Sequence, residues 1–234
     1  MFKFIHKGRV IRVLLLLISI LYMWFMYIDI YDIQSCISSD KLKFLSMILI
    51  FVISILAKKD VLNHKDLHLL QIGLFITVIA DLFLLVLNNH YILGISLFSI
   101  VQIIYIIRYK CGDIKFVIRK FVVIFISLLI IYFMVNKLVM KFDFIWVMGV
   151  FYAYCLISSV VEAFKVYRYK RYPKPNCYMI LIGMILFLLC DINVAIYNIF
   201  NEGLLYSISS VSMWLFYLPS QVLLSLSGYD YKFL

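Results

Sequence analysis

The sequence predicts an all-α membrane protein, a polytopic bundle of eight transmembrane helices in one domain covering residues 1–234. Two observations carry this prediction. The chain is 66% hydrophobic and 15% charged, so it is far more apolar than a soluble domain. Its apolar residues also gather into segments of about 16–24 residues, close to the length that a helix needs to cross roughly 30 Å of hydrocarbon.

Eight such segments follow one another, separated by short polar connections. The first has the basic start and apolar core of a signal peptide, but it lacks a small-x-small cleavage site and is expected to remain as a span. The second, fourth and fifth are near the lower length limit, and lysines such as Lys43 and Lys120 are expected to extend from them to the interface. The predicted spans are Val13–Ile28, Leu42–Ala57, Leu67–Leu87, Tyr91–Ile107, Phe121–Val135, Phe144–Phe164, Cys177–Phe200 and Leu204–Ser227.

The cations are divided unequally between the two sides that eight spans create. One side has only Lys41, Lys43, Lys137 and Lys141. The positive-inside rule places the richer side, and with it both termini, in the cytoplasm; the plasma membrane is the expected location. Since the cations are spread over short loops, the net charge of +10 indicates attraction to anionic lipids and argues against a nucleic-acid partner. The richer side has Lys3, Lys7, Arg9, Arg12, Lys58, Lys59, Lys65, Arg108, Lys110, Lys115, Arg119, Lys120, Lys165, Arg168, Lys170, Arg171, Lys174 and Lys232.

A weak internal repeat suggests two parallel halves of four spans each, near residues 1–113 and 114–234. In each half an acid lies in the third span, a glycine opens the fourth, and a glutamine and a tyrosine lie within the fourth. The matching residues are Asp81, Gly94, Gln102 and Tyr105 in the first half, and Asp191, Gly203, Tyr217 and Gln221 in the second. Repeats of this kind usually place the functional site where the halves meet.

Three acids lie inside the predicted spans, where a charge costs on the order of 3 kcal/mol. Glu162 is near the cytoplasmic end of its span and can pair with Lys165 one turn further on. Asp81 and Asp191 lie at similar depths, somewhat outside the midplane. We expect them to share a functional cavity; the alternative is that each makes a structural hydrogen bond to a neighbouring span.

Two buried carboxyl groups in one cavity can divide acid and base chemistry between them. One can stay protonated and donate its proton while the other stabilises positive charge or activates water. This division suits cleavage through an oxocarbenium ion, either of acetals or of vinyl ethers, and the spacing does not choose between them. No metal or cofactor is expected, because the five cysteines lack C-x-x-C spacing and are expected to be free thiols.

Two sets of short motifs resemble the YhhN family of lysoplasmalogenases. That family reads Gly-Asp-x-x-Leu, Leu-Gly-x-x-x-Phe and His-x-x-Tyr over two spans, then Gly, Leu-Phe, Ser-Asp, Ala, and a Tyr with a Gln four residues on. This chain differs at Gln102 for the His, Ala80 for the Gly and Cys190 for the Ser. The corresponding segments are Ala80–Leu85, Leu93–Phe98 and Gln102–Tyr105, and then Gly183, Leu186, Phe187, Cys190, Asp191, Ala195, Tyr217 and Gln221.

The resemblance covers most of the chain and implies hydrolysis of the vinyl ether of lysoplasmalogens. The products would be a fatty aldehyde and a glycerophosphoethanolamine or glycerophosphocholine, so the implied partner is a lysophospholipid within the membrane. Asp81 and Asp191 would form the acid/base pair. The residues that would orient them, or bind the headgroup or water, are Gln102, Tyr105, Tyr217 and Gln221.

Other classes of protein also carry two acids in a membrane. A non-catalytic lipid-binding protein, or a small-molecule or proton-coupled transporter, would use them to bind a cation or relay protons and would form no product. An intramembrane aspartyl protease would carry them in Tyr-Asp and Gly-x-Gly-Asp motifs, and neither Asp81 nor Asp191 stands in such a motif. Interrupted spans, which are common in transporters, are limited here to the one that contains Pro219.

Overall fold

The computed structural model describes residues 2–57, 61–88, 90–110, 114–138, 141–200 and 202–231, with side chains from Gly8 onward. Within these ranges the chain is all-α, as predicted. Lys58, Lys59 and Lys232, and the side chains of Lys3 and Lys7, to which the orientation prediction refers, lie outside the described residues. The elements are α1 (Phe2–Tyr31), α2 (Ser39–Leu56), α3 (His64–Asp81), its π-helical continuation η2 (Leu82–Leu87), α4 (Tyr91–Lys110), α5 (Ile114–Leu138), α6 (Phe144–Arg168), α7 (Lys174–Ile199) and α8 (Leu204–Leu226).

Helix boundaries follow from capping chemistry in the short connections. The Asn63 side chain accepts a hydrogen bond from the backbone N–H of Lys65 at the start of α3. At the start of α6, the Asp143 side chain accepts one from the backbone N–H of Ile145. Pro173 precedes α7, whose first turn tolerates a further proline because its N–H groups have no helical partner. Asn88, with φ of 49°, adopts the left-handed conformation that ends η2.

Six helices of the described chain are long and apolar enough to cross a membrane: α1, α3 with η2, α4, α5, α6 and α7. The chain is therefore an integral membrane protein by length and composition. The predicted spans at α2 and α8 do not meet the same criteria of length, hydropathy and charge. α2 has 18 residues, and three of its first five are charged. α8 carries several polar side chains, Ser220 and Gln221 among them, that are buried inside the bundle.

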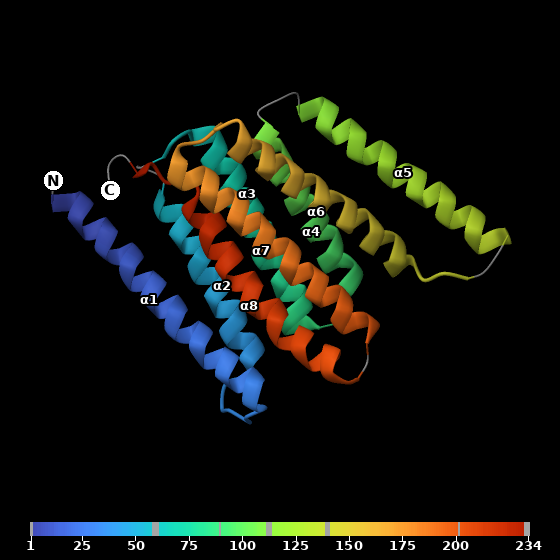
Figure 1. Cartoon of the computed structure of the whole chain (residues 1–234), viewed down its shortest axis with the longest axis horizontal. Coiled ribbons are helices and arrows are strands. Elements are labelled where there is room, and N and C mark those ends of the chain that lie inside the picture. The colour runs from blue at the N-terminus through green and yellow to red at the C-terminus, as the bar shows by residue number, and fades with distance from the viewer. Residues whose placement is uncertain are drawn as a thin grey trace.

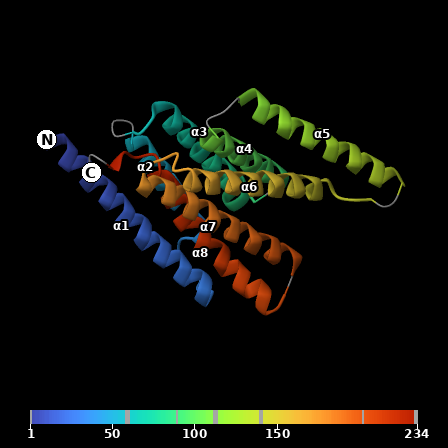
Figure 2. The ribbon, with the colours of Figure 1, turned by 45° about the horizontal axis from the view of Figure 1, so that its top comes forward.

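The helices form one bundle with α1 and α5 at its periphery (Figure 1). α1 runs along α2 and α8, and α5 lies against α4 and α6. A second view shows the same order, with α7 and α8 between α1 and α6 (Figure 2). The start of α1 and the end of α8 lie at the same end of the bundle in both views.

The helix contacts occur in matching pairs. α1 packs on α2, α2 on α3 and α3 on α4, while α5 packs on α6, α6 on α7 and α7 on α8. The contacts between the two sets also correspond: α2 meets α8 and α6 meets α4, while α1 meets α8 and α5 meets α4. This reciprocity is typical of two similar units related by a two-fold axis.

The buried positions repeat along the chain in the same way. Seven buried positions of α3, from Asp66 to Ala80, recur 110 residues later in α7, from Asn176 to Cys190. The buried positions of α4 from Phe98 to Arg108 recur 119 residues later, from Tyr217 in α8 to Ser227 just after the helix. In this correspondence Gln102 matches Gln221, as the repeat in the sequence suggests, but Tyr105 matches Leu224 and Tyr217 matches Phe98, so the two tyrosines do not correspond.

Close helix approach depends on small residues at the α7–α8 and α3–α4 contacts. The Ser220 hydroxyl of α8 donates a 2.7 Å hydrogen bond to the backbone oxygen of Gly183 in α7. Gly73 of α3 lies against the ring of Tyr105 in α4. Membrane helices commonly associate through small residues that allow backbone contact, since the lipid removes most of the hydrophobic driving force.

Gly73→Ala should therefore destabilise the bundle. An added Cβ would lie 2.7 Å from Cε1 of Tyr105, whose fully buried ring is stacked on Tyr109 and has little room to move. Overpacking of this kind costs about 1–3 kcal/mol. Gly149→Ala is the control, because nothing lies within 4 Å of its added Cβ. Thermal unfolding in detergent should show a lower midpoint for Gly73→Ala only; equal midpoints would contradict the tight contact.

Candidate functional site

Asp81 is the last residue of α3 and is almost fully buried, with 3% of its surface exposed. The Tyr217 hydroxyl of α8 donates to its carboxylate, at 3.0 Å from Oδ1 and 2.9 Å from Oδ2. The wider π-helical turn begins at the next residue, and such turns are frequent at functional sites. The acid expected in the third span is thus held from the eighth helix.

Asp191 lies on α7 and is half-buried. The hydroxyl of Tyr152 in α6 donates a hydrogen bond to its Oδ2. Each of the two aspartates is therefore held by one tyrosine from a neighbouring helix. The difference between them is exposure, since Asp81 is enclosed and Asp191 is partly open.

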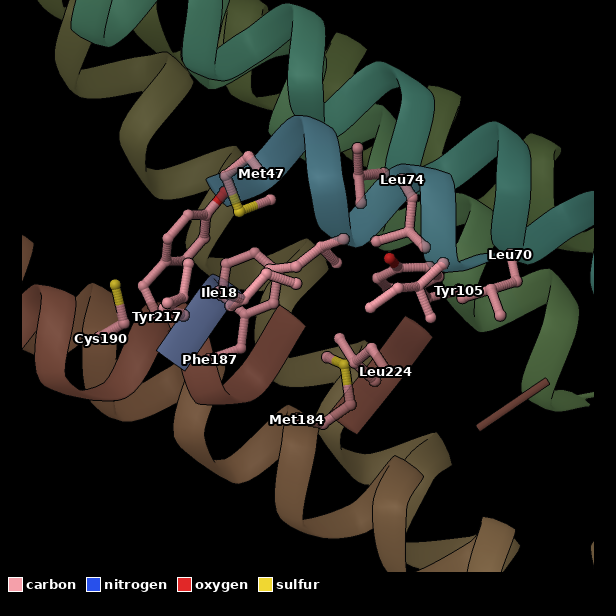
Figure 3. Close-up of a cluster of buried hydrophobic side chains, with 14 of the residues drawn as sticks. Ile18, Met47, Leu70, Leu74, Tyr105, Met184, Phe187, Cys190, Tyr217 and Leu224 are labelled. Atoms are coloured by element: carbon pink, nitrogen blue, oxygen red, sulfur yellow. The ribbon is translucent and has the colours of Figure 1, made fainter. Parts of the chain in front are cut away.

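An aromatic cluster joins the two aspartate–tyrosine pairs. The ring of Phe98 lies 6.4 Å from that of Tyr217 and 6.2 Å from that of Tyr152. Cys190 and Tyr217 each lie within electrostatic range of both Asp81 and Asp191. The two acids therefore belong to a single cluster, which we call the aspartate cluster: Asp81, Phe98, Tyr152, Cys190, Asp191 and Tyr217. Figure 3 shows Tyr217 and Cys190 together beside Phe187.

Gln102 is fully buried on α4 next to this cluster. Its Oε1 accepts a 2.6 Å hydrogen bond from the Ser159 hydroxyl of α6. The side chain also approaches Tyr152, although Nε2 has no hydrogen-bond partner of ordinary geometry among the described residues. Gln102 therefore lies next to Tyr152, the tyrosine that donates a hydrogen bond to Asp191.

Tyr105 and Gln221 lie deeper in the bundle and make no hydrogen bond to either aspartate. Tyr105 packs among Leu70, Leu74 and Leu224, away from Tyr217 (Figure 3). Gln221 is fully buried, and neither its amide nitrogen nor its oxygen has a partner in the described structure. Buried amides without partners are uncommon and normally have a structural or functional explanation.

Comparison with known proteins decides the family. The YhhN family matches residues 38–228, which include helices α2 to α8 and all six predicted site residues. The chain belongs to the YhhN family. Comparisons with curated proteins and with solved structures gave no match.

Two polar residues of this YhhN protein were not singled out from the sequence. Tyr152 and Ser159 lie in an apolar span that contains several other aromatic and hydroxyl residues, so composition gave no reason to select them. The available signal was spacing. The seven-residue separation places both on one face of α6, which packs on α4 and α7, where the glutamine and the second aspartate lie.

Two pockets of the described residues lie away from the aspartate cluster. One is between α4, α5 and α6 and the other between α6 and α7, and neither is lined by Asp81 or Asp191. The described residues also include no group of three or more His, Cys, Asp or Glu side chains that could hold a metal ion. The chemistry available at the aspartate cluster is therefore that of carboxyl, phenol, thiol and amide groups.

Proposed function

We propose that this YhhN protein hydrolyses the vinyl ether bond of lysoplasmalogens, with Asp81 and Asp191 as the acid/base pair. The main support is the aspartate cluster, in which each of two intramembrane carboxyl groups accepts a hydrogen bond from a tyrosine and Phe98 lies against both tyrosine rings. Membership of the YhhN family is consistent with a hydrolase. The products are a fatty aldehyde and a glycerophosphoethanolamine or glycerophosphocholine.

The reaction needs one proton donor and one carboxylate. The donor protonates the vinyl carbon remote from the ether oxygen, which leaves an oxocarbenium ion that the carboxylate stabilises. Water, deprotonated by the carboxylate, adds to the cationic carbon and gives a hemiacetal. The hemiacetal then collapses to aldehyde and alcohol, and the proton taken from water restores the pair. Tyr217 and Tyr152 orient the two carboxyl groups throughout.

The remaining predicted residues act around this pair. Gln102, which accepts a hydrogen bond from Ser159, approaches Tyr152 and holds it in position. Gln221 offers an amide that can bind water or a polar group of the substrate. Tyr105 supports the packing between α3 and α4 that fixes the position of Asp81. No residue in this scheme requires a metal or a cofactor.

The proposal for the membrane arrangement is that all eight helices span the plasma membrane, with both termini in the cytoplasm. α2 and α8 cross as internal helices of one domain, their polar side chains covered by neighbours. The two units of four helices, near residues 1–113 and 114–234, are parallel repeats that each contribute one aspartate. Matching helix contacts and matching buried positions support this division.

The direct test is an aldehyde assay on the purified full chain. We expect aldehyde from a lysoplasmalogen, and none from the acyl lysophospholipid of the same headgroup, because an ester cannot form the oxocarbenium ion by protonation at carbon. Binding of the lysoplasmalogen without any aldehyde would contradict the hydrolase. That result would favour a lipid carrier, whereas proton-coupled uptake into vesicles without product would favour a transporter.

A further inference from the structure

A cavity of about 170 Å³ opens between α4, α5 and α6, outside the aspartate cluster. Its lining is partly apolar and partly basic. Ile106, Val117 and Phe121 form part of an apolar wall, whereas one lysine comes from each of the three helices. These lysines are Lys110 at the end of α4, Lys120 near the start of α5 and Lys165 near the end of α6. We call this cavity the lysine pocket.

The charge of the lysine pocket is positive and only partly compensated. Lys165 forms a 2.7 Å ion pair with Glu162, whose other oxygen lies 3.8 Å from Arg171. Lys110 and Lys120 make no ion pair with any described acid, and their ammonium groups lie over aromatic rings instead. The pocket therefore presents three ammonium groups and one carboxylate, so a bound group with a negative charge would be stabilised.

The position of the lysine pocket matches the interface of a membrane. The three lysines lie at helix ends that face the same end of the bundle, on the side predicted to be rich in cations. Basic pockets between membrane helices on that side are typical binding sites for anionic lipid headgroups. The apolar wall continues along α5 through Ile124, Phe125 and Leu128, as the acyl chain of such a lipid would require.

The packing of α5 points to the same occupant. Within its described length only Val117 and Phe121 are buried, although α5 is 25 residues long. α1, which holds the corresponding place against α2 and α8, buries Ile11, Ile18, Leu21, Phe25, Met26 and Ile28. α5 therefore buries fewer of its own side chains against the bundle than α1 does, and the lysine pocket lies at the end of α5 where Val117 and Phe121 are buried.

We propose that the lysine pocket binds an anionic phospholipid of the surrounding membrane. Its phosphate lies among Lys110, Lys120 and Lys165, and an acyl chain covers the apolar wall between α5 and α6. This lipid fixes α5 to the bundle. The site is independent of the proposed hydrolase activity, since it shares no residue with the aspartate cluster.

The test compares thermal unfolding of the delipidated full chain with added phosphatidylglycerol, phosphatidylcholine or glycerol phosphate. Phosphatidylglycerol should raise the unfolding midpoint by several degrees more than phosphatidylcholine does. Glycerol phosphate, which lacks acyl chains, should give no shift. Equal shifts with both lipids, or the full shift with glycerol phosphate, would overturn the proposal.

Matched variants locate the effect. Lys110→Gln with Lys120→Gln should remove at least half of the phosphatidylglycerol shift. Lys137→Gln with Lys141→Gln, which removes the same charge at the other end of α5, should leave it unchanged. If the first variant folds poorly without lipid, Val161→Trp gives a second measure, because it fills the pocket without changing its charge. Val161→Trp should lower the phosphatidylglycerol retained in native mass spectrometry, and unchanged retention would count against the site.

Discussion

Replacing Asp81 with asparagine is expected to abolish aldehyde release from a lysoplasmalogen. The amide oxygen can still accept a hydrogen bond from the Tyr217 hydroxyl, so the packing around the site should survive. The amide can neither donate a proton to carbon nor carry the negative charge that stabilises an oxocarbenium ion. Loss of a positioned acid or base lowers the rate by at least about 100-fold.

Asp191→Asn should have a similar effect, and the double variant should be little slower than either single one. The effects on the rate of substituting two residues of one catalytic unit are not additive. Once one of them is lost, the other has no partner with which to exchange protons. Glu202→Gln is the control, since Glu202 is exposed in the connection before α8. Aldehyde release should be measured with saturating substrate and equal amounts of folded protein. If Asp81→Asn retained more than half of the activity, the acid/base assignment would be wrong.

The sequence predicted the helical order because hydrophobic segments report where a chain crosses apolar surroundings. Helix ends were predicted less well: α5 begins at Ile114, whereas the predicted span begins at Phe121. The reason is physical. Apolarity marks the part of a helix that faces hydrocarbon, while the helix itself continues through the interface with lysines and arginines whose stems are apolar.

From the sequence, Asp81 and Asp191 were predicted to lie close together, since both are acids at similar depths in apolar spans. Their individual partners were not. Tyr217 was expected near the acids and lies on Asp81, but Tyr105, three residues after Gln102, lies deeper and packs on Gly73. Nothing in one sequence distinguishes these tyrosines, because the partner of a side chain depends on how neighbouring helices are rotated and displaced along their axes.

Pro219 illustrates how packing resolves a feature that the sequence only flags. A proline inside α8 leaves the backbone oxygen four residues earlier, that of Leu215, without its helical donor. The hydroxyl of Tyr22 in α1 donates to that oxygen at 3.2 Å. The donor to the oxygen that the proline frees therefore comes from the contact between α1 and α8, which the sequence alone does not show.

The ion pair between Asp66 and Arg108 was not predicted, because both residues lie at span ends among other charges. Arg108 is 2% exposed and donates to both carboxylate oxygens of Asp66, at 2.8 Å from Nε and 2.9 Å from Nη2. Its Nη1 donates to the Ser227 hydroxyl at 3.0 Å, and the Tyr172 hydroxyl donates to Asp66. The pair therefore connects α3, α4, the end of α8 and the connection between α6 and α7. Treating α3 and α4 as an antiparallel hairpin would have placed the two charges opposite each other.

Arg108→Leu is expected to be the most destabilising of the single substitutions outside the aspartate cluster. It leaves the Asp66 carboxylate buried at 8% exposure without its cation, and breaking one side of a buried ion pair costs about 3–5 kcal/mol. For a chain of this size that corresponds to a fall of roughly 10 °C in the unfolding midpoint. The comparison is Lys165→Gln, which breaks a half-exposed pair on α6 and should cost less than about 1 kcal/mol.

The double variant Arg108→Leu with Asp66→Leu separates the charge effect from the loss of packing. With no unpaired charge left inside the bundle, its midpoint should be no lower than that of Arg108→Leu alone, even though two residues have changed. Losses that simply add would show that the pair acts mainly through the hydrogen bonds to Ser227 and Tyr172. Because the pair lies at the opposite end of α3 from Asp81, the double variant should also retain aldehyde release wherever it remains folded.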